Sequence, residues 1–158
     1  MNIEDQKEIY LDANFLVYWF ISKEPELKKR ARLLLVSFLT TKKGLYSSAL
    51  AFDEAWWGIK NEYNHQKGVK LSCSNELVFK ELERFTNLIL PKLNLIQFLD
   101  VRNGIVEALN YTKVFGLKPR DAFHLAIMRH NNITMIATDD GDFIEKQASM
   151  DIFVQSML

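Results

Sequence analysis

The chain has 158 residues, of which 48% are hydrophobic and 25% charged, a composition typical of a folded globular protein and not of a disordered one. Its 20 basic and 20 acidic side chains give a formal net charge of zero, which excludes nucleic-acid binding driven by the field of the whole molecule. The single cysteine, Cys73, excludes an internal disulfide.

Residues 1–158 fit one domain with a polar N-terminal tail over residues 1–8. Short apolar runs alternate with segments of helical periodicity. In chain order they predict a strand over 9–11, helices over 14–21 and 26–40, a strand over 45–47, a helix over 49–64 capped by Ser48, and a loop over 65–74. They then predict a helix from Ser74 or Asn75 to about Leu90, a strand over 93–99, helices over 101–115 and 119–130, and strands over 134–137 and 152–154.

Short apolar strands separated by helices indicate a parallel sheet with helices packed on it. We therefore expect a three-layer α/β/α sandwich with a mostly parallel five-stranded sheet. In such sheets, ligands bind at the carboxyl ends of the strands. The sequence contains neither a signal peptide nor an apolar run of the roughly 20 residues that cross a bilayer, so we expect a cytoplasmic protein without a membrane partner.

Four short acidic clusters stand where a predicted strand ends or a predicted helix begins. They lie at residues 10–14, 48–54, 119–122 and 138–143. Asp12 follows the first strand, Asp121 lies in the first turn of an apolar helix, and Asp140 comes shortly after the fourth strand. Carboxylates that meet in space repel one another unless a cation holds them together. The clusters therefore favour a divalent-metal site.

Each acid also has a purely structural interpretation. Asp12 could be a turn residue or a helix N-cap, Asp121 could be stabilised by the dipole of its helix, and residues 139–142 could form an acidic turn. Glu54 is the most informative, because its neighbours one helical turn away are Leu50, Ala51, Trp57 and Gly58. No lysine or arginine on its own helix can pair with it, and a metal is a natural partner.

In this order, the motifs resemble the PIN domain and, within it, the VapC-type toxins of toxin–antitoxin pairs. The matching segments are Leu-Asp-Ala-Asn at 11–14, Ser48 with Glu54, Lys-Pro-Arg-Asp-Ala-Phe-His-Leu-Ala at 118–126 and Ala-Thr-Asp-Asp-Gly-Asp-Phe at 137–143. The resemblance implies an acidic catalytic and metal-binding site made of Asp12, Glu54, Asp121 and Asp140. It also implies Asp142 as a frequent fifth metal ligand, with Asn14 and Thr138 as polar supports.

The resemblance implies a metal-dependent endoribonuclease that hydrolyses RNA with Mg²⁺ or Mn²⁺ and is restrained by a cognate antitoxin protein. Homodimers are common in the resembled family. Two alternatives stay open: a PIN-domain RNA-processing nuclease that is not a toxin, and a non-catalytic RNA- or protein-binding module. A phosphatase with an aspartyl-phosphate intermediate is disfavoured, because Asn14 stands where that chemistry needs a second aspartate.

RNA that approaches a cluster of acids needs cations at its rim. Lys118 and Arg120 flank Asp121 and are candidate phosphate contacts. Trp57, near Glu54, is a candidate for stacking on an unpaired base, although core packing or a dimer interface is the commoner role of such a residue. His124 lies one helical turn after Asp121 and so could approach the site, although an ordinary structural histidine is the commoner role of such a residue.

Overall fold

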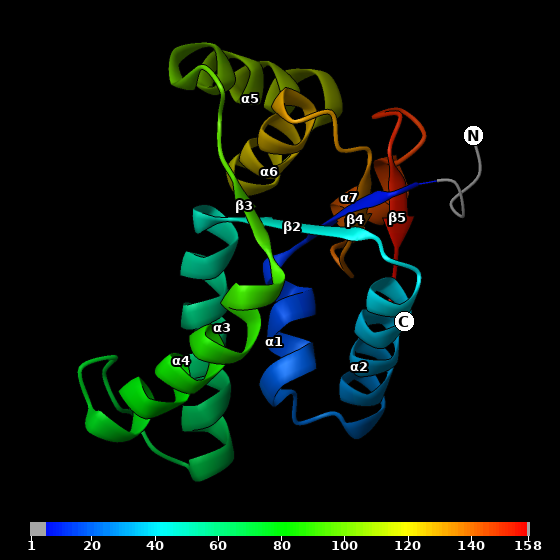
Figure 1. Ribbon diagram of the computed structural model, residues 1–158. Helices are drawn as coiled ribbons and strands as arrows, with labels where there is room; N and C mark the ends of the chain where they lie inside the picture. Colours follow the sequence, from blue (N-terminus) through cyan, green and yellow to red (C-terminus); the bar gives the residue numbers. More distant parts are fainter. Residues whose placement is uncertain (1–5, 158) are drawn as a thin grey trace.

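A five-stranded sheet runs through the centre of the protein (Figure 1). The structure is a computed structural model that describes residues 6–157. Residues 1–5 of the expected N-terminal tail lie outside this range. The strands are β1 (Glu8–Leu11), β2 (Gly44–Ser48), β3 (Asn94–Ile96), β4 (Met135–Ala137) and β5 (Phe153–Gln155). Their order is β3-β2-β1-β4-β5, and every neighbouring pair is parallel.

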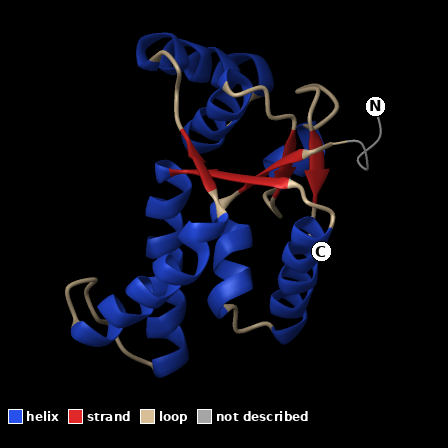
Figure 2. Ribbon diagram, viewed as in Figure 1, coloured by secondary structure: helices blue, strands red, loops and turns tan. Residues whose placement is uncertain are grey.

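Helices cover both faces of the sheet (Figure 2). One face packs against α1 (Ala13–Ile21), α2 (Pro25–Thr40), α3 (Ala49–Lys67) and α4 (Glu76–Ile89), which a short 3₁₀ turn over Leu90–Lys92 follows. The other packs against α5 (Val101–Phe115), α6 (Pro119–His130) and α7 (Gly141–Lys146). Alternation along β1 divides the two cores: Ile9 and Leu11 belong to the first, and Tyr10 belongs to the second. The predicted three-layer fold is confirmed.

The chain builds this sheet outward from its centre. β2 and β3 are added on one side of β1, and β4 and β5 are added on the other. The direction of winding therefore reverses between β1 and β4, and ligands bind at the carboxyl ends of the strands beside such a reversal. Asp12 and residues 138–140 follow these two strands directly.

Several element boundaries differ from those predicted. α3 continues through His65 to Lys67 and ends at Gly68, whose φ of 65° is the left-handed conformation that glycine adopts easily. β3 has only three residues. β4 begins one residue later than expected, and β5 is shifted by one residue at both ends. Residues 141–146, where the sequence offered only an acidic turn over 139–142 as a structural alternative, form α7, and Asp140 acts as its N-cap. Within residues 6–157, no helix combines the length and the apolar character that crossing a membrane requires.

Close packing of α1 on α3 depends on Gly58. A Cβ atom at this position would lie 2.7 Å from Cγ2 of Val17, which is nearer than two carbon atoms normally approach. Glycine therefore allows α1, which begins after Asp12, to lie close to α3, which carries Glu54. This contact sets the distance between two of the elements that supply acidic residues.

We expect Gly58→Ala to destabilise the protein. Overpacking costs about 1–3 kcal/mol, against roughly 1 kcal/mol gained from the higher helix propensity of alanine. Thermal unfolding should show a fall in the melting temperature, and adding Val17→Ala should cost less in this background than in the wild type. Gly141→Ala is the control, because a Cβ there meets nothing within 4 Å. Equal stability of the two single glycine variants would contradict this account of the packing.

Candidate metal centre

Asp12 joins the end of β1 to the start of α1. Its backbone N–H donates to the carbonyl of Ala137 at 3.2 Å, which continues the pairing of β1 with β4. Oδ1 accepts the N–H of Ala13 at 2.7 Å and thereby caps α1, and Oδ2 accepts the hydroxyl of Thr138 at 2.7 Å. The residue is only 6% exposed. Burial raises the pKa of Asp12, although the nearby His124 and the bond from Thr138 offset part of this effect.

Thr138 and Asn14 connect Asp12 with Asp140. The hydroxyl oxygen of Thr138 accepts the side-chain amide of Asn14 at 3.0 Å and the backbone N–H of Asp140 at 3.0 Å, while its hydrogen points to Asp12. Asp140 in turn caps α7, because its Oδ1 accepts the N–H of Asp142 at 2.8 Å. The two predicted polar supports therefore lie between the ends of β1 and β4.

Asp121, Asp140 and Asp142 form a second group of acids. Each offers a carboxylate oxygen within 4.8 Å of the others. Asp142 is neutralised by Lys118 at 3.2 Å and Lys146 at 2.7 Å, which lower its pKa. Asp121 differs: its Oδ2 is buried and has no hydrogen-bond partner among residues 6–157. Burial, followed by the charges of Asp140 and Asp12, raises the pKa of Asp121 to about 6.

Glu54 reaches the site from the second turn of α3, and both of its oxygens have partners on α6. Nε2 of His124 lies 3.0 Å from Oε2, and Nε of Arg120 lies 3.2 Å from Oε1. Burial alone would raise the pKa of Glu54, but the bond from His124 and the charge of Arg120 outweigh it, so that the pKa is lowered. The sequence correctly predicted that no cation on α3 pairs with Glu54, but it did not indicate these partners on α6.

His124 lies inside the site, whereas the sequence suggested an ordinary structural histidine. The ring is 1% exposed, and its Nε2 also lies 3.7 Å from Oδ1 of Asp12. Burial would lower the pKa of His124, but the bond to Glu54 and the charges of Asp12 and Glu54 raise it overall. Its place one turn after Asp121 on α6 was the available signal, because i and i+3 share a helix face.

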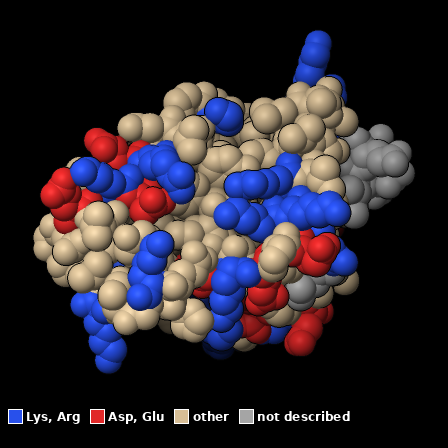
Figure 3. Space-filling view, turned by 90° about the horizontal axis from the view of Figure 1, so that it is seen from below, with Lys and Arg blue, Asp and Glu red and all other residues tan. Residues whose placement is uncertain are grey.

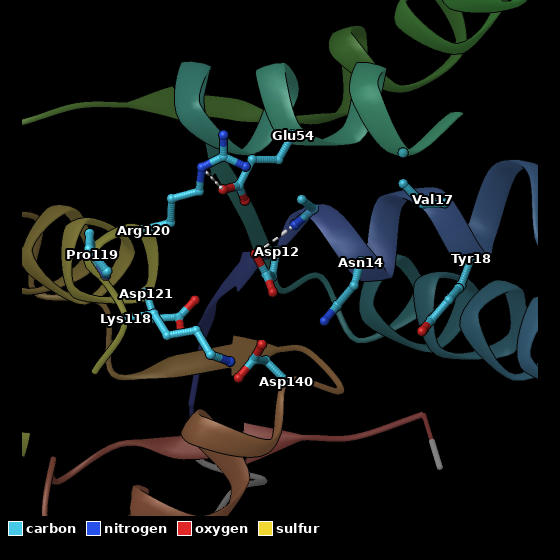
Figure 4. A pocket seen from close by; sticks show the side chains of 12 residues that line it. Asp12, Asn14, Val17, Tyr18, Glu54, Lys118, Pro119, Arg120, Asp121 and Asp140 are labelled. Carbon is cyan, nitrogen blue, oxygen red and sulfur yellow. Dashed lines mark hydrogen bonds and ion pairs between the residues drawn. The ribbon is translucent and has the colours of Figure 1, made fainter. Parts of the chain in front are cut away.

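Four of the acids, Asp12, Glu54, Asp121 and Asp140, line a cavity of about 690 Å³ and point into it from four segments of the chain (Figure 4). Lys118 and Arg120 lie at its rim. Trp57 is not among the lining residues. It lies in a separate groove between α3 and α4, 57% exposed, with Nζ of Lys60 3.9 Å from its ring centroid.

Charge on the surface is mixed, as the zero net charge requires. The face in Figure 3 carries groups of lysine and arginine side chains beside groups of acidic ones. Attraction of an anion to this surface would therefore be local, and at the acidic cavity it would depend on the cations at the rim.

Comparison with known proteins identifies the family. The family model for the PIN domain matches residues 9–148. The chain belongs to the PIN domain family. No match was found among curated proteins. Proteins of the family generally use a divalent metal ion, and the donor set here fits one: hard cations prefer carboxylate oxygens, and Asp121 presents a buried oxygen that lacks a partner within the described chain.

Solved toxin–antitoxin structures share the fold. FitAcB from Neisseria gonorrhoeae is 21% identical, with a TM-score of 0.62 and 94% of this chain and 97% of that chain covered. VapBC2 from Rickettsia felis, bound to a promoter DNA fragment, is 17% identical, with a TM-score of 0.62 and 94% and 98% covered. VapC20 from Mycobacterium tuberculosis, a toxin that cleaves the sarcin–ricin loop, is 15% identical, with a TM-score of 0.61 and 87% and 93% covered.

The raised pKa of Asp121 predicts a pH dependence of stability in the absence of metal. The folded state holds this proton up to about pH 6, whereas the unfolded chain releases it near its ordinary value of 3.8. The contribution of Asp121 to stability is therefore largest below the unfolded value and is lost as the pH rises through about 6.

Asp121→Asn should remove this part of the dependence. In EDTA, we expect the variant to gain melting temperature relative to the wild type as the pH rises from 4 to 7, by roughly 2–4 °C for each kcal/mol of burial cost and repulsion relieved. Asp53→Asn, an exposed acid on α3, is the matched control and should follow the wild type. Parallel curves for the wild type and Asp121→Asn would refute the assignment of electrostatic repulsion to Asp121.

Proposed function

We propose that this protein is a metal-dependent endoribonuclease that hydrolyses RNA phosphodiester bonds and acts as the toxin of a VapBC-type toxin–antitoxin pair. The observation that carries the proposal is the convergence of Asp12, Asp121 and Asp140 on one cavity, where a buried oxygen of Asp121 has no partner among residues 6–157. Three carboxylates from separate segments would only repel one another there without a cation.

Asp12, Asp121 and Asp140 are the residues that would hold Mg²⁺ or Mn²⁺, directly or through water. Asp142 lies in one group with Asp121 and Asp140, and Asp12 lies in a neighbouring group with Glu54 and His124. When bound, the ion would polarise the scissile phosphate and make a bound water more acidic. Glu54 faces the same cavity, with one oxygen hydrogen-bonded to His124 and the other in an ion pair with Arg120, an arrangement that suits it to orient a water molecule bound to the ion.

Lys118 and Arg120 would meet the substrate. Their side chains are 71% and 64% exposed, yet each already approaches an acid of the site. A phosphate of a single RNA strand offers the same kind of anionic oxygen at the cavity rim. The two cations would therefore offset the repulsion between the acidic cavity and the RNA backbone.

The partner would be a cognate antitoxin protein in the cytoplasm. The similar solved structures are complexes of the FitAB and VapBC type, and this supports the same kind of partner here. A homodimer is compatible with the exposed apolar side chains of α5, among them Val101, Val106 and Leu109.

Two other functions rest on the same fold. A PIN-domain nuclease of RNA processing would use the same acids but would act without an antitoxin. A non-catalytic RNA- or protein-binding module would not need them. The presence of all four acids in one cavity favours a catalytic function over a binding module.

A divalent cation should stabilise the protein by binding to the folded state alone. At a concentration of 100 times Kd, Mn²⁺ adds about 2.7 kcal/mol to the free energy of unfolding. We expect thermal unfolding to show this gain in the wild type and in Asp53→Asn, and to show little of it in Asp121→Asn. An undiminished response to Mn²⁺ in Asp121→Asn would disprove the assignment of this residue to the metal site.

RNA cleavage should depend on both the metal and Asp12. We expect a single-stranded RNA to be cut by the wild type with Mg²⁺ or Mn²⁺ but not in EDTA, and Asp12→Asn to lose the activity by about two orders of magnitude or more. Gel analysis of end-labelled RNA measures this directly. Asp53→Asn should cut like the wild type, and equal cutting by Asp12→Asn would point to a contaminating nuclease.

A further inference from the structure

A buried chain of hydrogen bonds stands behind Glu54. The N–H of Ala51, in the first turn of α3, donates to Oγ of Ser48 at 3.2 Å. This Oγ lies 2.6 Å from the hydroxyl of Tyr10, which lies 2.8 Å from Nδ1 of His124. Nε2 of His124 then lies 3.0 Å from Oε2 of Glu54. Ser48, Tyr10 and His124 are each at most 1% exposed.

The chain leaves the imidazole ring one orientation. An ionised carboxylate only accepts hydrogen bonds, so Nε2 of His124 carries a hydrogen and donates it to Glu54. The other ring nitrogen is occupied by Tyr10, which belongs to β1. A rotation of the ring would break both bonds where no water can replace them, and an unsatisfied buried polar group is costly. The ring on α6 is therefore tied to the central strand of the sheet.

Glu54 is held from two directions as a result. His124 occupies Oε2 and Arg120 occupies Oε1, whereas Asp121 has a buried oxygen without a hydrogen-bond partner in the described part of the chain. His124 also lies between Glu54 and Asp12, at 3.0 and 3.7 Å. The carboxylate of Glu54 is thus fixed beside Asp12 by the protein itself.

We propose that His124 is a positioning residue of the metal site, which holds the carboxylate of Glu54 in place through its links to Tyr10 and Ser48. This inference rests on the proposed metal-dependent nuclease. His124 need not contact the metal or the RNA; it acts through Glu54. Removing the Nε2 donor should therefore weaken the site only while Glu54 is present.

Two substitutions separate the two sides of the ring. The amide nitrogen of His124→Gln can take the place of Nε2 and still donate to Glu54, whereas the shorter side chain of His124→Asn reaches only the position of Nδ1. Both are compared in the wild type and in Glu54→Ala, and Tyr10→Phe tests the far side of the ring with little change in volume. The readouts are Mn²⁺ affinity by titration calorimetry and the melting temperature in EDTA.

We expect His124→Asn to weaken Mn²⁺ binding by about 10–100-fold, the usual loss on removing the support of a metal site, and His124→Gln to weaken it far less. Tyr10→Phe should fall between them. In Glu54→Ala, the same substitutions at His124 should change the affinity by less than about twofold, because coupled residues are not additive. The melting temperatures in EDTA should be non-additive in the same way.

Equal losses for His124→Gln and His124→Asn, or the same loss with and without Glu54, would overturn the positioning role and leave His124 as a packing residue. Additive melting temperatures would overturn it as well. If the wild type binds no Mn²⁺, the proposed metal site fails and the positioning role fails with it. Mn²⁺ binding by the wild type with additive effects would overturn the positioning role alone, so the two failures are distinguishable.

Discussion

Repulsion between gathered carboxylates is the constraint on which the rest of the site depends. Burial raises the pKa of Asp121 most, and the charges of Asp140 and Asp12, which line the same cavity, raise it further. The protein offsets this repulsion with internal donors and cations, one for each carboxylate oxygen of three of the acids. They are Thr138 and the N–H of Ala13 at Asp12, His124 and Arg120 at Glu54, and Lys118 and Lys146 at Asp142.

The topology explains why the acids meet at this place. β1 lies at the centre of the sheet, and the winding direction reverses between β1 and β4, so that the ends of these strands open onto one cavity. Asp12 and Asp140 each begin a helix there and use Oδ1 as the cap. The structural and the functional interpretations of these aspartates are therefore compatible, because a carboxylate has two oxygens and a cap uses one.

Much of this arrangement could be predicted from the sequence, because it depends on local patterns. The alternation of apolar strands and helices predicted the layers, and the positions of Asp12, Asp121 and Asp140 at element ends predicted that they share an edge of the sheet. The length of α3 and the existence of α7 were less accessible. A polar segment such as 65–67 has no apolar period, and α7 has only six residues.

Pairings between distant elements were the part that the sequence could not supply. Arg120 and His124 lie on α6, 66 and 70 positions after Glu54, and only the packing of α6 beside α3 brings them to it. Trp57 shows the same limit in the other direction. It lies one turn after Glu54 on α3, yet its side chain lines the groove against α4 and not the acidic cavity.

The two halves of the site consequently differ in what holds them. The half with Asp12, Glu54 and His124 is satisfied by the protein's own hydrogen bonds, which hold Asp12 and Glu54 in place before a cation arrives. The half with Asp121 and Asp140 has a buried oxygen without a partner in residues 6–157 and a strongly raised pKa. A cation would stabilise the site most where the protein itself offsets the least repulsion between carboxylates. The gain from metal binding would therefore be largest at the half with Asp121 and Asp140. The first half would then serve as the fixed wall against which the metal and its water are placed.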